Sequence, residues 1–297
     1  MENQEDNMER RTMQNNNGVT RSLSHVWDDL DYEWKSWLIP IFMGINVLIF
    51  LVMMFINNCP SHNNITINGR SCVWSFLGRF SFHPLHYNPL LGPGPHTLMK
   101  MGAITWSAVV QHHQGWRLFI SIWLHTGLIH LLINMLSLFF VGTHLEQKFG
   151  FLKIGTIYLL AGIGGNMTSC LFYPKHICVG PTSALLGLIG SMFADLVTNL
   201  TIYNNKVLAG LTILLMFVIN LVITVVPHPH NAGPIGGFII GILLGFILLP
   251  RPVVGWHHLY DHSTNSKFKP HQYVFGITSL VILVIGFILG LIMLFRT

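Results

Sequence analysis

Charged side chains are scarce in this sequence: Asp, Glu, Lys and Arg make up 9% of its 297 residues, whereas a soluble domain carries about 25%. Hydrophobic residues make up 51%. This composition excludes an ordinary soluble domain and predicts a protein that crosses the lipid bilayer several times. The net charge of +5 does not indicate a nucleic-acid partner, because the basic residues stand in connections and tails, where they set membrane topology.

Cysteine is also scarce, with four residues, which excludes a fold held together by many disulfides. Cys59 and Cys72 share one polar connection. They could form a disulfide if that connection faces an oxidising lumen, or remain two free thiols, because sequence alone does not fix the pairing. Cys170 and Cys178 lack the spacing of metal ligands. We predict no metal site and no cofactor.

The N-terminus lacks the apolar core of a signal peptide. Residues 1–36 are polar and rich in Asn. Their early acidic residues argue against an organellar transit peptide, which is typically poor in acids. We predict that residues 1–36 form a disordered cytosolic tail.

Residues 37–297 are predicted to form one all-α membrane domain, because stretches of about 20 apolar residues, enough to cross a bilayer, recur along the chain. We predict seven spans, near residues 37–56, 118–141, 154–172, 180–197, 207–226, 232–249 and 274–294. Two longer polar connections separate them, at residues 57–117 and 250–272. The first is too long for an ordinary loop, which indicates structure or function of its own.

Small residues at helical spacing predict which spans are neighbours. They recur every four positions in the sixth span, at Gly233, Gly237, Gly241 and Gly245, and in the fourth span, at Ser183, Gly187 and Ser191. A ridge of small residues lets a second helix backbone approach closely. We therefore expect the fourth and sixth spans to pack together.

The distribution of Lys and Arg over the short connections predicts a cytosolic N-terminus and a luminal C-terminus. The connection at residues 57–117 is then luminal and that at 250–272 cytosolic. This topology brings Thr182, His130 and residues 228–231 to the luminal side of the membrane. Polar groups inside a membrane are costly unless they form hydrogen bonds or perform chemistry, so we expect any functional site there.

Several motifs between about residues 82 and 251 resemble the rhomboid family of intramembrane serine proteases. Gly115-Trp116-Arg117 resembles the Trp-Arg pair of the family's first luminal loop, and the stretch from His130 to Asn134 resembles its His-x-x-x-Asn. The stretch from Leu145 to Gly150 resembles the one after the second core helix. The seventh span and residues 88–92 resemble the plant members. The resemblance implies a bundle of six core transmembrane helices plus one C-terminal helix.

Two positions depart from the pattern that this resemblance implies. The stretch from Gly180 to Gly190 resembles the family's Gly-x-Ser-Gly, and it places Thr182 at the nucleophilic serine and Ser183 at the following glycine. Ile235-Gly236-Gly237 resembles the end of the family's Ala-His-x-Gly-Gly and places Pro234 at the base histidine. Both members of the implied catalytic pair are therefore replaced.

The chemistry of these replacements predicts an inactive protein. A hydroxyl is a weak nucleophile until a base takes its proton, and the extra methyl group of Thr182 limits how its oxygen can aim. Pro234 can neither accept nor relay a proton, and general-base catalysis typically contributes about 10²- to 10⁴-fold. The alternative is an active protease with a displaced pair, formed by Thr182 or Ser183 with His230.

His130 and Asn134 match positions that the resemblance assigns to stabilisation of an oxyanion, although they could equally hold the bundle together through hydrogen bonds. We expect a pseudoprotease that binds single-span transmembrane clients without cleaving them. Asn64 lies in a glycosylation sequon that is usable only in a luminal loop. Together with the plant resemblance, it favours the secretory pathway, with the Golgi as a candidate compartment.

Overall fold

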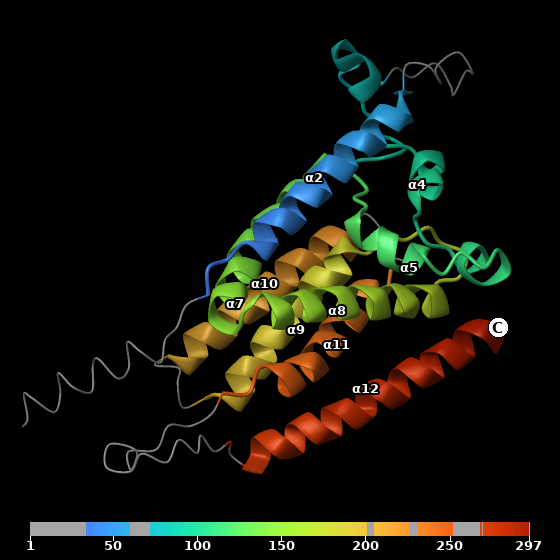
Figure 1. The fold of residues 1–297 in the computed structure, drawn as a ribbon. Helices are drawn as coiled ribbons and strands as arrows, with labels where there is room; N and C mark the ends of the chain where they lie inside the picture. The colour runs from blue at the N-terminus through green and yellow to red at the C-terminus, as the bar shows by residue number, and fades with distance from the viewer. Residues whose placement is uncertain are drawn as a thin grey trace, which may run out of the picture.

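The computed structural model describes residues 34–59, 72–200, 205–225, 231–251, 268 and 270–296 (Figure 1). Its long helices are α2 (Leu38–Asn57), α8 (Phe151–Phe172), α9 (Pro181–Thr198), α10 (Lys206–Val225), α11 (Gly233–Leu248) and α12 (Pro270–Arg296). A further helix of 22 residues consists of α6 (Leu128–Ser137), the π-helical turn η4 (Leu138–Gly142) and α7 (Thr143–Phe149). Asn64, His230 and most of the two regions 1–36 and 250–272 lie outside the described residues.

Six of these helices are long and apolar enough to cross a membrane, within the part of the chain that the structure describes. The seventh, α11, has 16 residues and is equally apolar. At 1.5 Å per residue it is about 24 Å long, shorter than the hydrocarbon core of about 30 Å, so its ends lie near the edges of that core. The predicted all-α membrane fold is confirmed.

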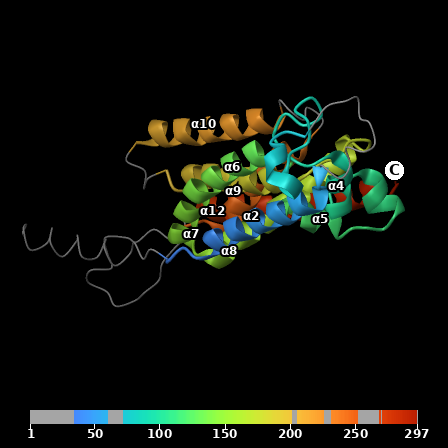
Figure 2. The same ribbon diagram turned by 90° about the horizontal axis from the view of Figure 1, so that it is seen from above.

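Helix α9 occupies the centre of the bundle, between α8 and α11 (Figure 1). In α9, 83% of the membrane-spanning window is buried, against 17% in α10 and in α12. Figure 2 shows α10 along the outer side of the bundle. The polar side chains that matter for function are therefore those of α9 and of the helices that touch it.

The contact between α9 and α11 is made by backbone atoms rather than by side chains. A Cβ atom on Gly241 would lie 2.0 Å from the carbonyl oxygen of Gly187, and one on Gly237 would lie 2.1 Å from that of Ser183. No side chain fits at either position. The predicted pairing of the fourth and sixth spans is thus confirmed, and the glycines at period four are its cause.

The second span starts later than predicted: it begins at Leu128, not at residue 118, and continues to Phe149. Residues 117–123 form two short helical turns, α5 (Arg117–Ile120) and η3 (Ser121–Trp123), and the backbone is then extended at Leu124 and Gly127. The amide of Asn88 donates to the carbonyl of Thr126, which helps hold this extended segment against the connection at residues 57–117. Hydropathy did not detect this break, because the short helical turns before it, at residues 118–123, are mostly apolar and read as part of a span.

The start of α2 explains why the second span can include a carboxylate. The carboxylate of Glu146, fully buried, accepts hydrogen bonds from the backbone N–H groups of residues 37, 38 and 39, at 2.8–3.0 Å, and from the Ser36 hydroxyl at 2.7 Å. These are the orphan donors of the first turn of a helix. Ser36, predicted to belong to the tail, is consequently bonded to the bundle.

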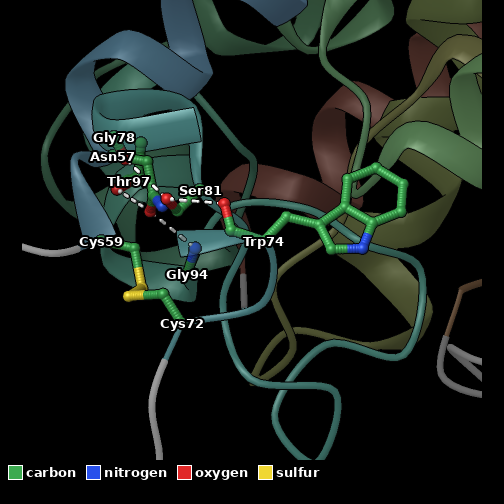
Figure 3. Close-up of a disulfide and its surroundings, with 8 residues drawn as sticks. All are labelled: Asn57, Cys59, Cys72, Trp74, Gly78, Ser81, Gly94 and Thr97. Atoms are coloured by element: carbon green, nitrogen blue, oxygen red, sulfur yellow. Dashed lines mark hydrogen bonds between the residues drawn. A yellow bond between two sulfur atoms is a disulfide. The ribbon is translucent and has the colours of Figure 1, made fainter. Parts of the chain in front are cut away.

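The connection at residues 57–117 has structure of its own, as its length indicated. It contains η1 (Ser75–Phe80), α4 (Pro95–Met101) and η2 (Ser107–Gln111). A disulfide joins Cys59 to Cys72 (Figure 3). Beside it, the Asn57 side chain accepts hydrogen bonds from the Gly94 N–H and the Thr97 hydroxyl, which fastens the end of α2 to the start of α4.

A substitution at Gly241 tests the contact between α9 and α11. Gly241→Ala places a methyl group against the Gly187 carbonyl, so we expect it to lower the free energy of unfolding in mixed micelles by about 2–3 kcal/mol. The matched control is Gly286→Ala in α12, where nothing lies within 4 Å of the new Cβ. That variant should be neutral or up to about 1 kcal/mol more stable. Equal effects at both positions would contradict the assigned contact.

Candidate functional site

Thr182 stands in the first turn of α9, at the luminal-side end that the sequence predicts. Pro181 opens the helix, where its missing N–H has no intrahelical acceptor and its fixed φ angle suits the turn. Gly180 precedes it in a non-helical conformation, packed so closely on Asn166 that a Cβ would lie 2.0 Å from the amide oxygen. Pro181 and Gly180 therefore fix where α9 begins, one residue before Thr182.

The Thr182 hydroxyl lies at the centre of a hydrogen-bond network that joins three helices. Its oxygen is 2.8 Å from His130 Nε2 and 3.3 Å from Asn134 Nδ2, both on α6, and 3.1 Å from the Thr224 hydroxyl on α10. On the other side of the imidazole, His130 Nδ1 is 3.0 Å from the Thr126 hydroxyl. We call Thr126, His130, Asn134, Thr182 and Thr224 the threonine network.

The threonine network uses every hydrogen-bonding direction of the Thr182 oxygen. If the hydroxyl donates to His130 Nε2, its lone pairs accept from Asn134 and Thr224. If His130 Nε2 carries the proton, the lone pairs accept from His130 and Asn134, and the hydroxyl donates to Thr224, whose own proton goes to the Asn220 carbonyl at 3.0 Å. In neither tautomer does a lone pair of Thr182 remain available to attack a substrate.

The threonine network is also buried away from solvent. The side chains of Thr182, His130, Asn134 and Thr224 are between 1% and 4% exposed. His125, from the same predicted span, is fully buried, with its ring 5.4 Å from that of His130. A satisfied, buried polar network holds helices in one arrangement, whereas a protease needs an accessible hydroxyl.

Ser183 lies on a different side of α9 from Thr182. Its hydroxyl is buried and faces α8 and α11: it would lie 3.0 Å from a Cβ on Gly165 and 2.6 Å from one on Gly233. Among the described residues the Ser183 oxygen has no hydrogen-bond partner, so the structure brings no base to it. His230, its proposed alternative base, lies outside the described residues.

Pro234 is buried in the first turn of α11, where proline is tolerated. The start of this helix is held by Asn231, whose side-chain oxygen accepts from the Gly233 N–H at 3.0 Å and from the Ser169 hydroxyl at 2.6 Å. The position that the rhomboid resemblance assigns to a base therefore carries a helix-starting residue, and the neighbouring polar groups serve the helix end.

Trp116 and Arg117 stand outside the threonine network. Arg117 Nη1 donates to the carbonyls of Met99 and Ala103, at 2.7 and 2.8 Å, and its guanidinium lies 5.0 Å from the centre of the Trp116 ring. These bonds fasten the end of α4 to the start of α5. In this structure the pair holds the connection at residues 57–117 in place.

Sequence reasoning missed Thr126 and Thr224, and it named Asn231 only as part of the connection at residues 228–231. Thr126 lies four residues before His130, and Thr224 is a hydroxyl inside an otherwise apolar span; both patterns were visible in the sequence but weak. Within the described residues, no three His, Cys, Asp or Glu side chains converge as a metal site requires.

Comparison with known proteins identifies the family. A model of the rhomboid domain matches residues 112–251. RHOMBOID-like protein 2 of Arabidopsis thaliana is 46% identical over 288 residues, which cover 96% of this chain and 90% of that protein. The chain belongs to the rhomboid family.

Other rhomboid relatives differ in what their names state. RHOMBOID-like protein 6, mitochondrial, of Arabidopsis thaliana is 46% identical over 270 residues, which cover 89% of this chain and 87% of that protein. Inactive RHOMBOID-like protein 8 of the same plant is 42% identical over 234 residues, 76% of this chain and 65% of that protein. This rhomboid is thus similar both to proteins named inactive and to proteins not so named.

Removing the Thr182 oxygen tests the threonine network. Thr182→Val keeps the shape but removes the hydroxyl that His130 Nε2 and Asn134 Nδ2 contact, at about 1–3 kcal/mol for each buried atom left unsatisfied. We expect a loss of about 2–4 kcal/mol in the free energy of unfolding in mixed micelles. Thr182→Ser keeps the oxygen and should lose less than about 1 kcal/mol. If valine and serine are equally tolerated, the hydroxyl does not support the bundle.

Proposed function

We propose that this rhomboid protein is a pseudoprotease that binds single-span transmembrane clients without cleaving them. The observation that carries this proposal is the state of the Thr182 hydroxyl, whose proton and both lone pairs are engaged by His130, Asn134 and Thr224.

Two chemical requirements of serine-type proteolysis are not met, and this supports the proposal. The nucleophile needs a free lone pair aimed at the scissile carbonyl, and the threonine network occupies both. The reaction also needs a base to take the proton and later return it to the leaving group, and Pro234 provides none. With no attacking oxygen, donors such as Asn134 have no oxyanion to stabilise.

The retained bundle supports a role in client binding. The contacts of α8, α9 and α11 are intact, while α10 contributes few buried side chains: only Ile213, Asn220 and Thr224 are nine-tenths buried among those described for it. A helix so lightly covered leaves an apolar flank on which a client helix could pack within the membrane.

One observation favours a second candidate, an active threonine protease. His130 Nε2 lies 2.8 Å from the Thr182 oxygen, and Thr126 contacts the opposite ring nitrogen at 3.0 Å. A nucleophile, a base and a group that orients the base stand in this order in hydrolases that use a hydroxyl. This candidate would employ His130 rather than His230 as the base.

A reconstituted cleavage and crosslinking assay separates the two candidates. Proteoliposomes would contain the full chain and a single-span model substrate with a photo-crosslinker in its transmembrane segment. We expect the native protein to crosslink to the substrate without cutting it. Thr182→Ser combined with Pro234→His should restore cleavage by at least about 100-fold over the native protein, the lower range of general-base catalysis.

The outcomes of this assay are distinct. Cleavage by the native protein that disappears in His130→Ala would establish the second candidate and refute the first. Absence of both cleavage and crosslinking by the native protein would refute client binding. Thr182→Val serves as the control for the nucleophile position, because it lacks the oxygen in either background.

We further propose that the N-terminus is cytosolic and that the loop at residues 57–117 faces the lumen of a secretory compartment, with the Golgi as the candidate. The disulfide between Cys59 and Cys72 supports this placement, because disulfides persist in oxidising compartments. The basic residues near the other ends of the helices, such as Lys148 and Arg251, support it as well.

Glycosylation at Asn64 tests this topology. In plant cells we expect the protein to lose mass on treatment with a glycosidase, and the variant Asn64→Gln to be insensitive to it. Asn199→Gln is the matched control, since that sequon lies at the end of α9 on the proposed cytosolic side. Glycosylation that is lost in Asn199→Gln but kept in Asn64→Gln would reverse the topology.

A further inference from the structure

A groove of about 460 Å³ lies between α11 and α12, away from the threonine network. Its walls include Phe246 and Leu248 on α11 and Gln272, Gly276 and Leu280 on α12, and Lys153 at the start of α8 lines it too. Apart from Lys153, Gln272 and the hydroxyl-bearing Tyr273, the lining residues are apolar or glycine. A volume of this size is typical of sites for small molecules.

The groove runs from one membrane surface inward. Gln272, Gly276 and Leu280 are spaced four apart and so share one face of α12, over a length of about 12 Å. The end of α11 and the start of α12 meet at this surface, where Gln272 donates a hydrogen bond to the carbonyl of Arg251 at 3.1 Å, and Lys153 at the start of α8 also lines the groove. Lys153 therefore lies at the mouth and the apolar residues lie toward the membrane interior.

Gly276 shapes the floor of the groove. A Cβ on this residue would lie 3.5 Å from the backbone oxygen of Phe246, so the two helices are already in contact there. Next to it, the rings of Phe246 and Phe275 stack with their centres 5.1 Å apart. A larger side chain at position 276 would project into the space that the groove occupies.

The mouth of the groove is positively charged. The nearby carboxylate of Asp195 is engaged by Lys148, at 3.0 Å, and by Arg251, at 3.8 Å. Within the part of the chain that the structure describes, no carboxylate pairs with the ammonium group of Lys153.

We propose that this groove binds an anionic glycerophospholipid, with the phosphate on Lys153 and an acyl chain along Gly276 and Leu280. A cation at the membrane surface attracts anionic headgroups, and an apolar channel below it accepts the chain. A transmembrane client helix does not fit, because a spanning helix about 10 Å wide and 30 Å long fills on the order of 2,000 Å³. The site is independent of the proposed pseudoprotease role.

The hydrogen bonds of Gln272 hold the mouth open in a fixed geometry. Its amide nitrogen donates to the Asn199 side chain, at 3.3 Å, and to the Arg251 carbonyl. Gln272 thus joins the first turn of α12 to the ends of α9 and α11. The bound lipid would fill the space below this connection and complete the contact between α12 and the core.

The test is the lipid composition retained by the purified full chain. The protein would be extracted from vesicles of equal parts phosphatidylcholine and phosphatidylinositol, and its bound lipids counted by native mass spectrometry. We expect about fivefold enrichment of phosphatidylinositol, the size expected for one lysine at an anionic surface. Lys153→Gln should abolish the enrichment, and Gly276→Leu should remove the bound lipid of either kind.

Matched variants keep the test specific. Lys100→Gln on α4 removes an exposed lysine elsewhere, and Gly286→Leu adds the same bulk to α12 where nothing lies within 4 Å. Both controls should retain native enrichment and the native unfolding temperature. Unchanged enrichment in Lys153→Gln, an equal loss in Lys100→Gln, or displacement of the lipid by inorganic phosphate with no effect of Gly276→Leu would each overturn the proposal.

Discussion

The backbone contact between α9 and α11 is the constraint on which the rest of this structure depends. A carbonyl oxygen of α9 occupies the space where Gly241 would otherwise carry a side chain, so this close packing of the two helices requires glycine there. That packing buries the first turn of α9 and sets the direction of the Thr182 side chain. Van der Waals contact of this kind is the main attraction between helices in lipid, where no hydrophobic effect draws them together.

In this arrangement, the residue at the nucleophile-like position, Thr182, helps to hold the bundle together. Thr182 receives polar groups from α6 and α10 and satisfies each of them. An active hydroxyl must keep a lone pair free, which in a buried site leaves hydrogen-bonding capacity unused and costs stability. A buried hydroxyl whose proton and lone pairs are all hydrogen-bonded stabilises the folded bundle instead, because none of its hydrogen-bonding capacity is left unused.

Much of the fold could be predicted because the signals for a membrane helix lie within a short stretch of sequence. Runs of apolar residues located the spans, and glycines at period four identified α9 and α11 as neighbours. The start of the second span could not be located in this way. The residues just before the extended segment, 118–123, are mostly apolar and hide the break, and a hydrogen bond from the distant residue Asn88 helps hold that segment. Thr224 escaped notice for the same reason, since its partner is 42 residues away.

The sequence by itself determined that the chain is a helical membrane protein. It also determined that Thr182 and Pro234 stand where the rhomboid resemblance has a serine and a histidine. Both could be read because composition, periodicity and motifs do not depend on how the chain folds. Only the tertiary structure decided what surrounds these residues. It turned Thr182 toward His130 and Ser183 toward Gly233, although the two are adjacent in the chain. The physical reason is that one step along a helix rotates the side chain by about 100°, so neighbours in sequence meet different helices.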